Sequence, residues 1–178
     1  MATNSIPVYD ATVGVATHAL QTLQALLKKA QAHPDAASFS STRIAPDMLP
    51  FAFQVLTVSN NAKKIVERLA PTKADLSVWE DNHESTLDEL VARVEKTLAL
   101  LATVEVKDVE LKDQGIKFGP AYPNVPATGG QYVLGYVLPN LFFHLSMAYA
   151  ILRMKGVELG KADYLGPFVK DFFPGSGK

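Results

Sequence analysis

Four long segments of this chain place apolar side chains at intervals of three and four residues, the spacing that gathers them on one face of an α-helix. These segments span residues 10–32, 47–69, 86–101 and 132–154. A proline follows each of the first two, at Pro34 and Pro71, and proline disfavours helical geometry in the residue before it. The pattern predicts an all-α protein, an antiparallel four-helix bundle. Residues 1–178 are expected to form this single domain, with a flexible tail from about residue 174.

Capping residues mark the expected starts of three of these helices. Asp47 stands at the N-cap position of the second segment, where its carboxylate can accept from free backbone N–H groups. Thr86 with Glu89, and Thr128 with Gln131, have the spacing of capping boxes before the third and fourth segments. We therefore expect the second helix to begin at Asp47 and the other two directly after their threonines.

The remaining stretches show other patterns. Residues 104–111 alternate between apolar and charged side chains, and the chain from there to Pro126 contains several glycines and prolines. This predicts a short hairpin or an irregular excursion before the fourth helix. Gly156 fits the position after a helix end, and the chain beyond it, including residues 164–168, is expected to pack over the bundle mostly without helical structure.

The fourth segment is nearly all apolar, but Asn140, His144, Ser146 and Arg153 interrupt it. These polar side chains favour a helix within a bundle over a membrane span, which needs ~18 uninterrupted apolar residues. Pro139 lacks a backbone N–H and its ring presses on the carbonyl four residues earlier, so a kink is predicted at this point.

Charge balance and the absence of cysteine exclude several classes of function. The 17 basic and 18 acidic side chains give a formal net charge of −1, without the positive excess typical of proteins that bind nucleic acid or anionic membranes. The sequence contains no cysteine, which removes disulfides, thiolate metal sites and thiol nucleophiles. The first residues show no secretory signal, and a cytoplasmic location is expected.

His144 is the first candidate for chemistry. On a helical wheel centred on His144, Asn140 and four apolar residues lie within about 40° of it. A polar pair one turn apart is thus expected to project into an apolar interior, where polar groups need hydrogen-bond partners and where bundles place ligand sites. The alternative is a satisfied core pair that specifies packing and performs no chemistry.

A second polar line lies on the segment 47–69, where Asp47, Gln54 and Asn61 recur every seven residues. Such a line at the border of an apolar face can point toward the same cavity, although a cap explains Asp47 and a solvated edge explains the two amides. We take His144 as the candidate catalytic residue. The candidate ligand-binding residues are Asn140, Gln54, Asp47, Asn61 and Phe51.

Several motifs occur in a recognisable order along the chain. They are Tyr9-Asp10-Ala11, residues 26–33, residues 43–51 with Gln54, and residues 138–144, 148–153, 156–160 and 164–166. Together they resemble a family of short proteins of unknown function in the DinB-like four-helix-bundle superfamily. The resemblance covers most of the chain except the third helix and residues 104–126. It implies a four-helix bundle, often dimeric, in a family without an assigned activity.

The wider superfamily includes metal-dependent enzymes, among them thiol-dependent transferases and maleylpyruvate isomerase-like proteins. The resemblance implies three histidine ligands in such enzymes, one on the second helix and an H-x-x-x-H pair on the fourth. Here the second helix has no histidine, and the fourth offers His144 with Asn140 or with Ala148. Because amides are poor ligands for zinc or nickel, no metal and no other cofactor is expected.

These patterns leave three hypotheses for function. In the first, a small organic molecule binds between the second and fourth helices, and His144 donates or accepts a proton in an isomerisation, a cyclisation or a similar reaction. Asn140 and Gln54 would orient a carbonyl or hydroxyl, and the imidazole suits this role if its pKa stays near 6.5. In the second, the bundle is non-catalytic and forms a homodimer or binds a partner. The third, a metal-dependent transferase, needs ligands that the chain does not supply.

Overall fold

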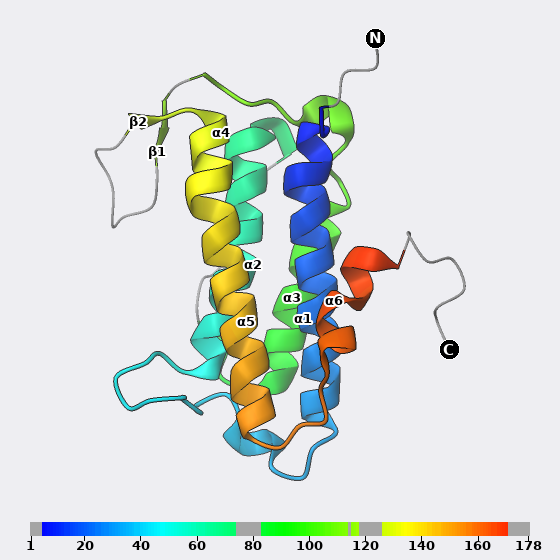
Figure 1. Cartoon of the computed structure of the whole chain (residues 1–178), viewed down its shortest axis with the longest axis vertical. Coiled ribbons are helices and arrows are strands. Elements are labelled where there is room, and N and C mark those ends of the chain that lie inside the picture. The colour runs from blue at the N-terminus through cyan, green and yellow to red at the C-terminus, as the bar shows by residue number, and fades with distance from the viewer. Residues whose placement is uncertain (1–4, 74–82, 114, 118–125, 171–178) are drawn as a thin grey trace.

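Four long helices stand side by side in the computed structural model, which describes residues 5–73, 83–113, 115–117 and 126–170 (Figure 1). The expected flexible tail from residue 174 lies outside these ranges. The long helices are α1 (Val15–Gln31), α2 (Phe51–Leu69), α3 (Leu87–Leu101) and α5 (Leu138–Met154). A π-helical turn, Asp10–Gly14, precedes α1 without a break.

Shorter elements complete the described chain. They are the 3-10 turns Ala36–Ser38, Pro71–Lys73 and Val106–Asp108, the strands β1 (Ile116–Lys117) and β2 (Pro126–Ala127), the helix α4 (Gly129–Tyr132), the π-helical segment Val133–Val137, and the helix α6 (Lys161–Val169). The two strands pair in antiparallel fashion, with Ile116 opposite Ala127. The excursion before the fourth long helix therefore contains one short antiparallel strand pair, whereas the alternating residues 104–111 form no strand and include the 3-10 turn Val106–Asp108.

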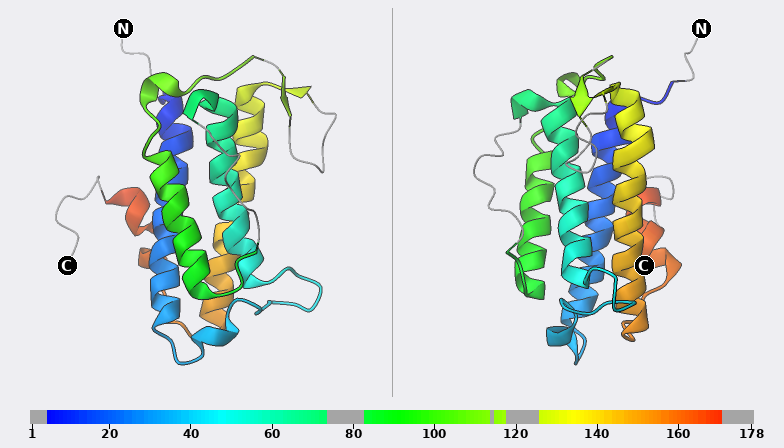
Figure 2. Two further views of the ribbon diagram at one scale, coloured as in Figure 1. Left: turned by 180° about the vertical axis from the view of Figure 1, so that it is seen from behind. Right: turned by 90° about the vertical axis from the view of Figure 1, so that its left-hand side faces the viewer.

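The long helices follow the order α1, α3, α2, α5 around the bundle (Figure 2). Both α1 and α5 begin at one end of the molecule, whereas α2 and α3 begin at the other. Neighbours α1 and α3 are therefore antiparallel, as are α2 and α5, while α2 and α3 run in the same direction. The predicted all-α four-helix bundle is confirmed, but its antiparallel arrangement is corrected: α3 starts beside the start of α2, so α2 and α3 are parallel neighbours, as are α1 and α5.

The apolar stripes of the sequence form the core. Leucines at three- and four-residue spacing on α1, such as Leu20, Leu23 and Leu27, are fully buried, and α2 contributes Val55, Val58, Ala62 and Ile65 in the same way. Because isolated helices of this length are marginal in water, burial of these shared faces supplies most of the stability of the helices. Both predicted capping boxes are present, at Thr86 with Glu89 and at Thr128 with Gln131.

The start of α2 differs from the prediction. Asp47 lies in an exposed turn and caps nothing, and the helix begins four residues later at Phe51, after Pro50. The preceding loop takes over the role of the cap, because the carbonyl of Thr42 accepts from the N–H of Phe51 at 2.8 Å and that of Ser40 accepts from Ala52 at 3.0 Å. Tertiary contacts with the loop thus satisfy the first free N–H groups of the helix.

The segment after Gly156 is also corrected, since residues 161–169 form the helix α6 rather than irregular chain. The N–H of Gly160 donates to the carboxylate of Asp163 at 2.7 Å, and Lys29 of α1 contacts the same carboxylate at 2.7 Å. The buried hydroxyl of Thr22 donates to the carbonyl of Tyr164 at 3.0 Å. These contacts anchor α6 to α1, so the expected packing over the bundle is present.

The helix that runs from α4 through α5, Gly129–Met154, buries only one of its faces. It is the one described helix long and apolar enough to cross a membrane by length and composition, a test that core helices of soluble proteins also pass. Its inner side packs against α1 and α2, whereas Leu134, Phe143 and Met154 are exposed by 71%, 54% and 51%. The segment Val133–Val137, which ends two residues before Pro139, is π-helical, and the kink expected at Pro139 stays a prediction.

Candidate functional site

A groove with a cavity volume of about 540 Å³ lies between α2 and α5, within the size range of small-molecule sites. Its lining residues are Pro50, Ala52, Phe53, Leu56, Thr57, Asn60, Asn61, Lys64, Tyr136, Asn140 and His144. Of the residues proposed from sequence, His144, Asn140 and Asn61 meet here. Gln54 is not part of the lining, since only 3% of its surface is exposed, but its side chain contacts His144 beneath the groove.

Gln54 fixes the orientation and the tautomer of His144. The Nε2 of Gln54 donates to the carbonyl of Leu49 at 2.9 Å, and its Oε1 lies 2.7 Å from Nδ1 of His144. Because the amide nitrogen faces Leu49, the amide oxygen must accept the proton that His144 carries on Nδ1. The second ring nitrogen, Nε2, is therefore left with a free lone pair, and no described residue donates to it.

Asn61 and Asn140 form a second contact between the two helices. The Nδ2 of Asn140 donates to Oδ1 of Asn61 at 3.2 Å. The Nδ2 of Asn61 is buried, with 2% of the residue exposed, and has no hydrogen-bond partner among the described residues. An unpaired buried amide donor costs stability, so this group is a candidate for contact with a bound molecule.

The environment of His144 is apolar. Desolvation by burial lowers its pKa from 6.5 to about 4, because the charged imidazolium loses hydration that the surroundings do not replace. The rings of Phe53 and Phe143 meet the imidazole edge-on, with centroids 5.8 and 5.1 Å away. At pH 7 His144 is therefore neutral and can act as an acceptor through Nε2, and its pKa does not stay near 6.5, the value on which the sequence hypothesis made its role depend.

A third polar contact links the helices nearer the other end of the bundle. The guanidinium of Arg68 donates to the hydroxyl of Tyr132 at 2.6 Å, and burial raises the pKa of this fully buried phenol to about 12. Gln54, Asn61 and Arg68 follow each other at seven-residue intervals, so α2 presents one polar stripe to its neighbour.

The π-helical segment aligns Tyr132 with the groove residues on the facing helix. In a uniform α-helix, Asn140 would lie about 80° around the axis from Tyr132, since each residue turns the chain by about 100°. The i→i+5 bonding of residues 133–137 accommodates one extra residue, which reduces this difference to about 20°. Both side chains therefore face α2, where the polar stripe lies.

Two of the candidates from sequence are not brought to the groove. Asp47 is exposed in its turn, and Phe51 is fully buried in the core. Sequence reasoning missed Lys64, Tyr136 and Phe53, which all line the groove. Lys64 lies three residues after Asn61, so helix spacing alone could have found it, whereas Phe53 directly precedes Gln54 and lies about 100° from it around the helix.

Asn60, at the edge of the groove, is held from behind by α3. Arg93 is 4% exposed, and its guanidinium donates to Asn60 at 2.5 Å, to Ser59 at 2.9 Å and to the carboxylate of Glu84 at 2.8 Å. A buried charge with this many partners is satisfied, and loss of one partner would be costly. The network fixes α2 against α3, which holds the polar stripe of α2 toward α5.

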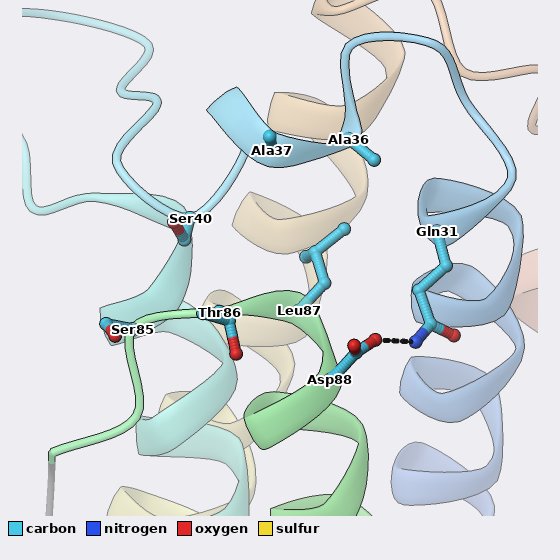
Figure 3. Close-up of a pocket in the computed structure, with 8 residues that line it drawn as sticks. All are labelled: Gln31, Ala36, Ala37, Ser40, Ser85, Thr86, Leu87 and Asp88. Carbon is cyan, nitrogen blue, oxygen red and sulfur yellow. Dashed lines mark hydrogen bonds between the residues drawn. The ribbon is translucent and has the colours of Figure 1, made fainter.

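A second cavity, of about 300 Å³, lies at the end of the bundle where α1 and α3 approach each other (Figure 3). It is lined by Gln31, Ala36, Ala37, Ser40, Ser85, Thr86, Leu87 and Asp88. Gln31 already donates to Asp88, and the hydroxyl of Thr86 accepts from the N–H of Glu89. These polar groups serve helix capping and helix contact, and the cavity offers no titratable group comparable to His144.

The groove does not fit the histidine-rich metal site of the wider superfamily. Among the described residues, no group of three or more histidine, cysteine, aspartate or glutamate side chains could hold a metal ion. The groups beside His144 are the amides of Gln54, Asn61 and Asn140, which are weak ligands for zinc or nickel. The donor set of this groove is suited to neutral polar groups.

Comparison with known proteins agrees with this fold. The sequence model of a domain of unknown function, DUF1993, matches residues 8–165. The chain belongs to the DUF1993 family. No curated protein matched it. Among solved structures, this DUF1993 chain is similar to a DinB family member from Shewanella denitrificans, determined by crystallography at 1.83 Å resolution. The two share 33% identity over 89% of this chain and 92% of that chain, with a TM-score of 0.79.

The family match and the structural likeness confirm the resemblance to an uncharacterised DinB-like family. They cover almost the whole bundle, including the parts of α2 and α5 that form the groove. They assign no activity, so the function of this DUF1993 chain has to be argued from the groove itself.

Proposed function

We propose that this DUF1993 chain binds a small organic molecule in the groove between α2 and α5 and that His144 moves a proton on it. The observation that carries the proposal is the buried Nδ2 of Asn61, a donor without a partner among the described residues that lines the groove. The lone pair on Nε2 of His144 lies in the same groove. A satisfied core pair would leave neither group without a hydrogen-bond partner.

The low pKa of His144 bears on the kind of proton transfer it can perform. At pH 7 the imidazole is neutral and can accept a proton; with a pKa of about 4 it is a weaker base than a free histidine, and its imidazolium is a correspondingly stronger acid that returns the proton readily. This behaviour suits an isomerisation, in which the same proton is taken from one atom and given to another. Gln54 would hold the ring in place, and Asn140 would orient the substrate.

A capture experiment tests the proposal while the ligand is still unidentified. Untagged protein is incubated with a small-molecule extract of the cells that express it, separated by gel filtration and denatured, and the released compounds are identified by mass spectrometry. We expect one compound to be enriched by the wild type and lost from Asn61→Leu and His144→Leu. Ser40→Ala, a change in the second cavity, should retain it.

Recovery of the same compounds from all variants would contradict the proposed site. Conversion is tested on the captured compound itself, by chromatographic separation of its isomers after incubation with each protein. If Gln54 only positions the ring, Gln54→Leu should bind the compound with a similar Kd and convert it more slowly. Circular dichroism of each variant excludes loss of the fold as the cause.

A second candidate function, self-association, is favoured by exposed apolar side chains on the outer side of the continuous helix Gly129–Met154. Leu134, Phe143 and Met154 expose large apolar surfaces, which on soluble proteins often mark interaction sites. The corresponding proposal is that a second copy of the chain covers Phe143 and forms a homodimer. Multi-angle light scattering should then give twice the mass of one chain, and Phe143→Glu should reduce it to that of a monomer.

A further inference from the structure

We infer that the ligand of the groove is an uncharged, planar carbonyl compound with an N–H or O–H group beside its carbonyl, as in a cyclic amide. The inference rests on the proposed function and adds the chemical class of the ligand. It follows from the hydrogen-bonding groups that the two helices present, from the charges around them and from the shape of the walls.

The hydrogen-bonding groups that lack a partner within the described part of the chain differ between the two helices. On α2, Nδ2 of Asn61 is a donor without a partner among the described residues. On α5, Nε2 of His144 is an acceptor, and Oδ1 of Asn140 is a second one, because the nitrogen of that amide already donates to Asn61. A molecule that bridges the groove therefore needs an acceptor toward α2 and a donor toward α5. The C=O and N–H of a cyclic amide supply both.

The two acceptors of α5 lie one helical turn apart, at a rise of about 6 Å along the axis. A single short polar unit can therefore approach either of them while its carbonyl reaches Asn61. His144 is the acceptor to which the ligand can also lose its proton, and Asn61 is the donor that would stabilise the negative oxygen left behind. This arrangement adds a role to the proposed isomerisation: Asn61 donates to the carbonyl oxygen of the ligand.

Charge and wall shape favour an uncharged, flat molecule. Among the described residues that line the groove, none is an aspartate or glutamate that could pair with a cation. Lys64 is the one lysine or arginine in this described lining, and it already has an interaction partner in the chain. A charged ligand would lose hydration without full compensation. The side chains of Phe53, Leu56 and Tyr136 supply apolar and aromatic surface for a ring to pack against.

Nuclear magnetic resonance of the full ¹⁵N-labelled chain tests the inference with three probes. The probes are 2-pyridone, which carries both C=O and N–H, N-methyl-2-pyridone, which lacks the donor, and benzoate, which is charged. We expect 2-pyridone to shift the side-chain amide signal of Asn61 and the ring nitrogens of His144 in a saturable manner. N-methyl-2-pyridone should bind about tenfold more weakly, because one acceptor on α5 is left unpaired.

Variants of α5 test whether its two acceptors cause this preference. Asn140→Leu and His144→Leu together should remove the preference for 2-pyridone over its N-methyl form, and Ser40→Ala should keep it. Equal binding of the two pyridones by the wild type, tighter binding of benzoate, or no shift with 2-pyridone would each overturn the ligand class. The capture experiment then distinguishes the cases: a recovered compound of another class leaves the proposed function standing, whereas no recovered compound removes both.

Discussion

Acidification should destabilise the bundle through His144. In the unfolded chain the imidazole has its ordinary pKa of 6.5, whereas burial in the folded bundle lowers this pKa to about 4. Between these two values the unfolded chain binds a proton that the folded chain does not, so protonation favours unfolding. This contribution begins as the pH falls below 6.5 and is complete below about pH 4.

The expected size follows from the difference between the two pKa values. Each pKa unit corresponds to 1.36 kcal/mol, so the shift from 6.5 to about 4 gives about 3 kcal/mol for a fully shielded group. His144 is only half-buried at the edge of the groove, and solvent screening reduces this to about 2 kcal/mol. Such a loss is a large share of the 5–15 kcal/mol that stabilises a typical domain.

Urea unfolding at pH 7.5, 5.5 and 4.5 measures this loss when wild type is compared with His144→Leu. Carboxylates titrate in both proteins, so the difference between their free energies of unfolding isolates the imidazole. We expect the wild type to lose about 2 kcal/mol more than the variant between pH 7.5 and 4.5. Parallel pH profiles, together with an imidazole pKa near 6.5 from a histidine proton titration, would refute the assigned environment.

Three further predictions concern the frame around the groove. Thr86→Ala should lower the free energy of unfolding by about 1 kcal/mol, measured in urea, because the capping box at the start of α3 is lost. Arg93→Ala should cost about 3–5 kcal/mol, seen as a large drop in Tm, because Glu84 is left without its buried cation; a change below 1 kcal/mol would contradict the network. Dialysis against EDTA should leave Tm unchanged, whereas a fall that zinc or nickel reverses would show a metal that stabilises the fold.

The helices were predictable from sequence because their signals are local. The leucine spacing on α1 and the threonine capping boxes depend only on residues within a few turns, and both appear in the structure as expected. The start of α2 was not predictable in this way. Its first N–H groups bond to carbonyls of Ser40 and Thr42, about ten residues earlier, and no local pattern announces that loop.

The helix α6 was missed for a related reason. Gly166 and Pro167 are poor helix residues, and a short segment containing them would not be helical in isolation. The hydrogen bond from Thr22 and the contact of Lys29 with Asp163 come from α1, more than 130 residues away. Tertiary contacts therefore overrode the local preference.

The candidate site was predictable as two polar stripes but not as a set of pairs. The spacing of His144 with Asn140, and of Gln54 with Asn61, placed each pair on one helix face. Which residues meet across the groove depends on the offset between α2 and α5. The structure pairs His144 with Gln54 and Asn140 with Asn61, and it shows the buried donor that no sequence pattern could reveal.

The π-helical segment Val133–Val137 makes the two ends of this long helix separately adjustable during evolution. Gly135, within the segment, is exposed. The segment holds one residue more than an α-helical turn would, and this extra residue affects only one turn of the helix. Deleting that residue would leave a relative with either the Arg68–Tyr132 contact or the groove contacts in place, but not both.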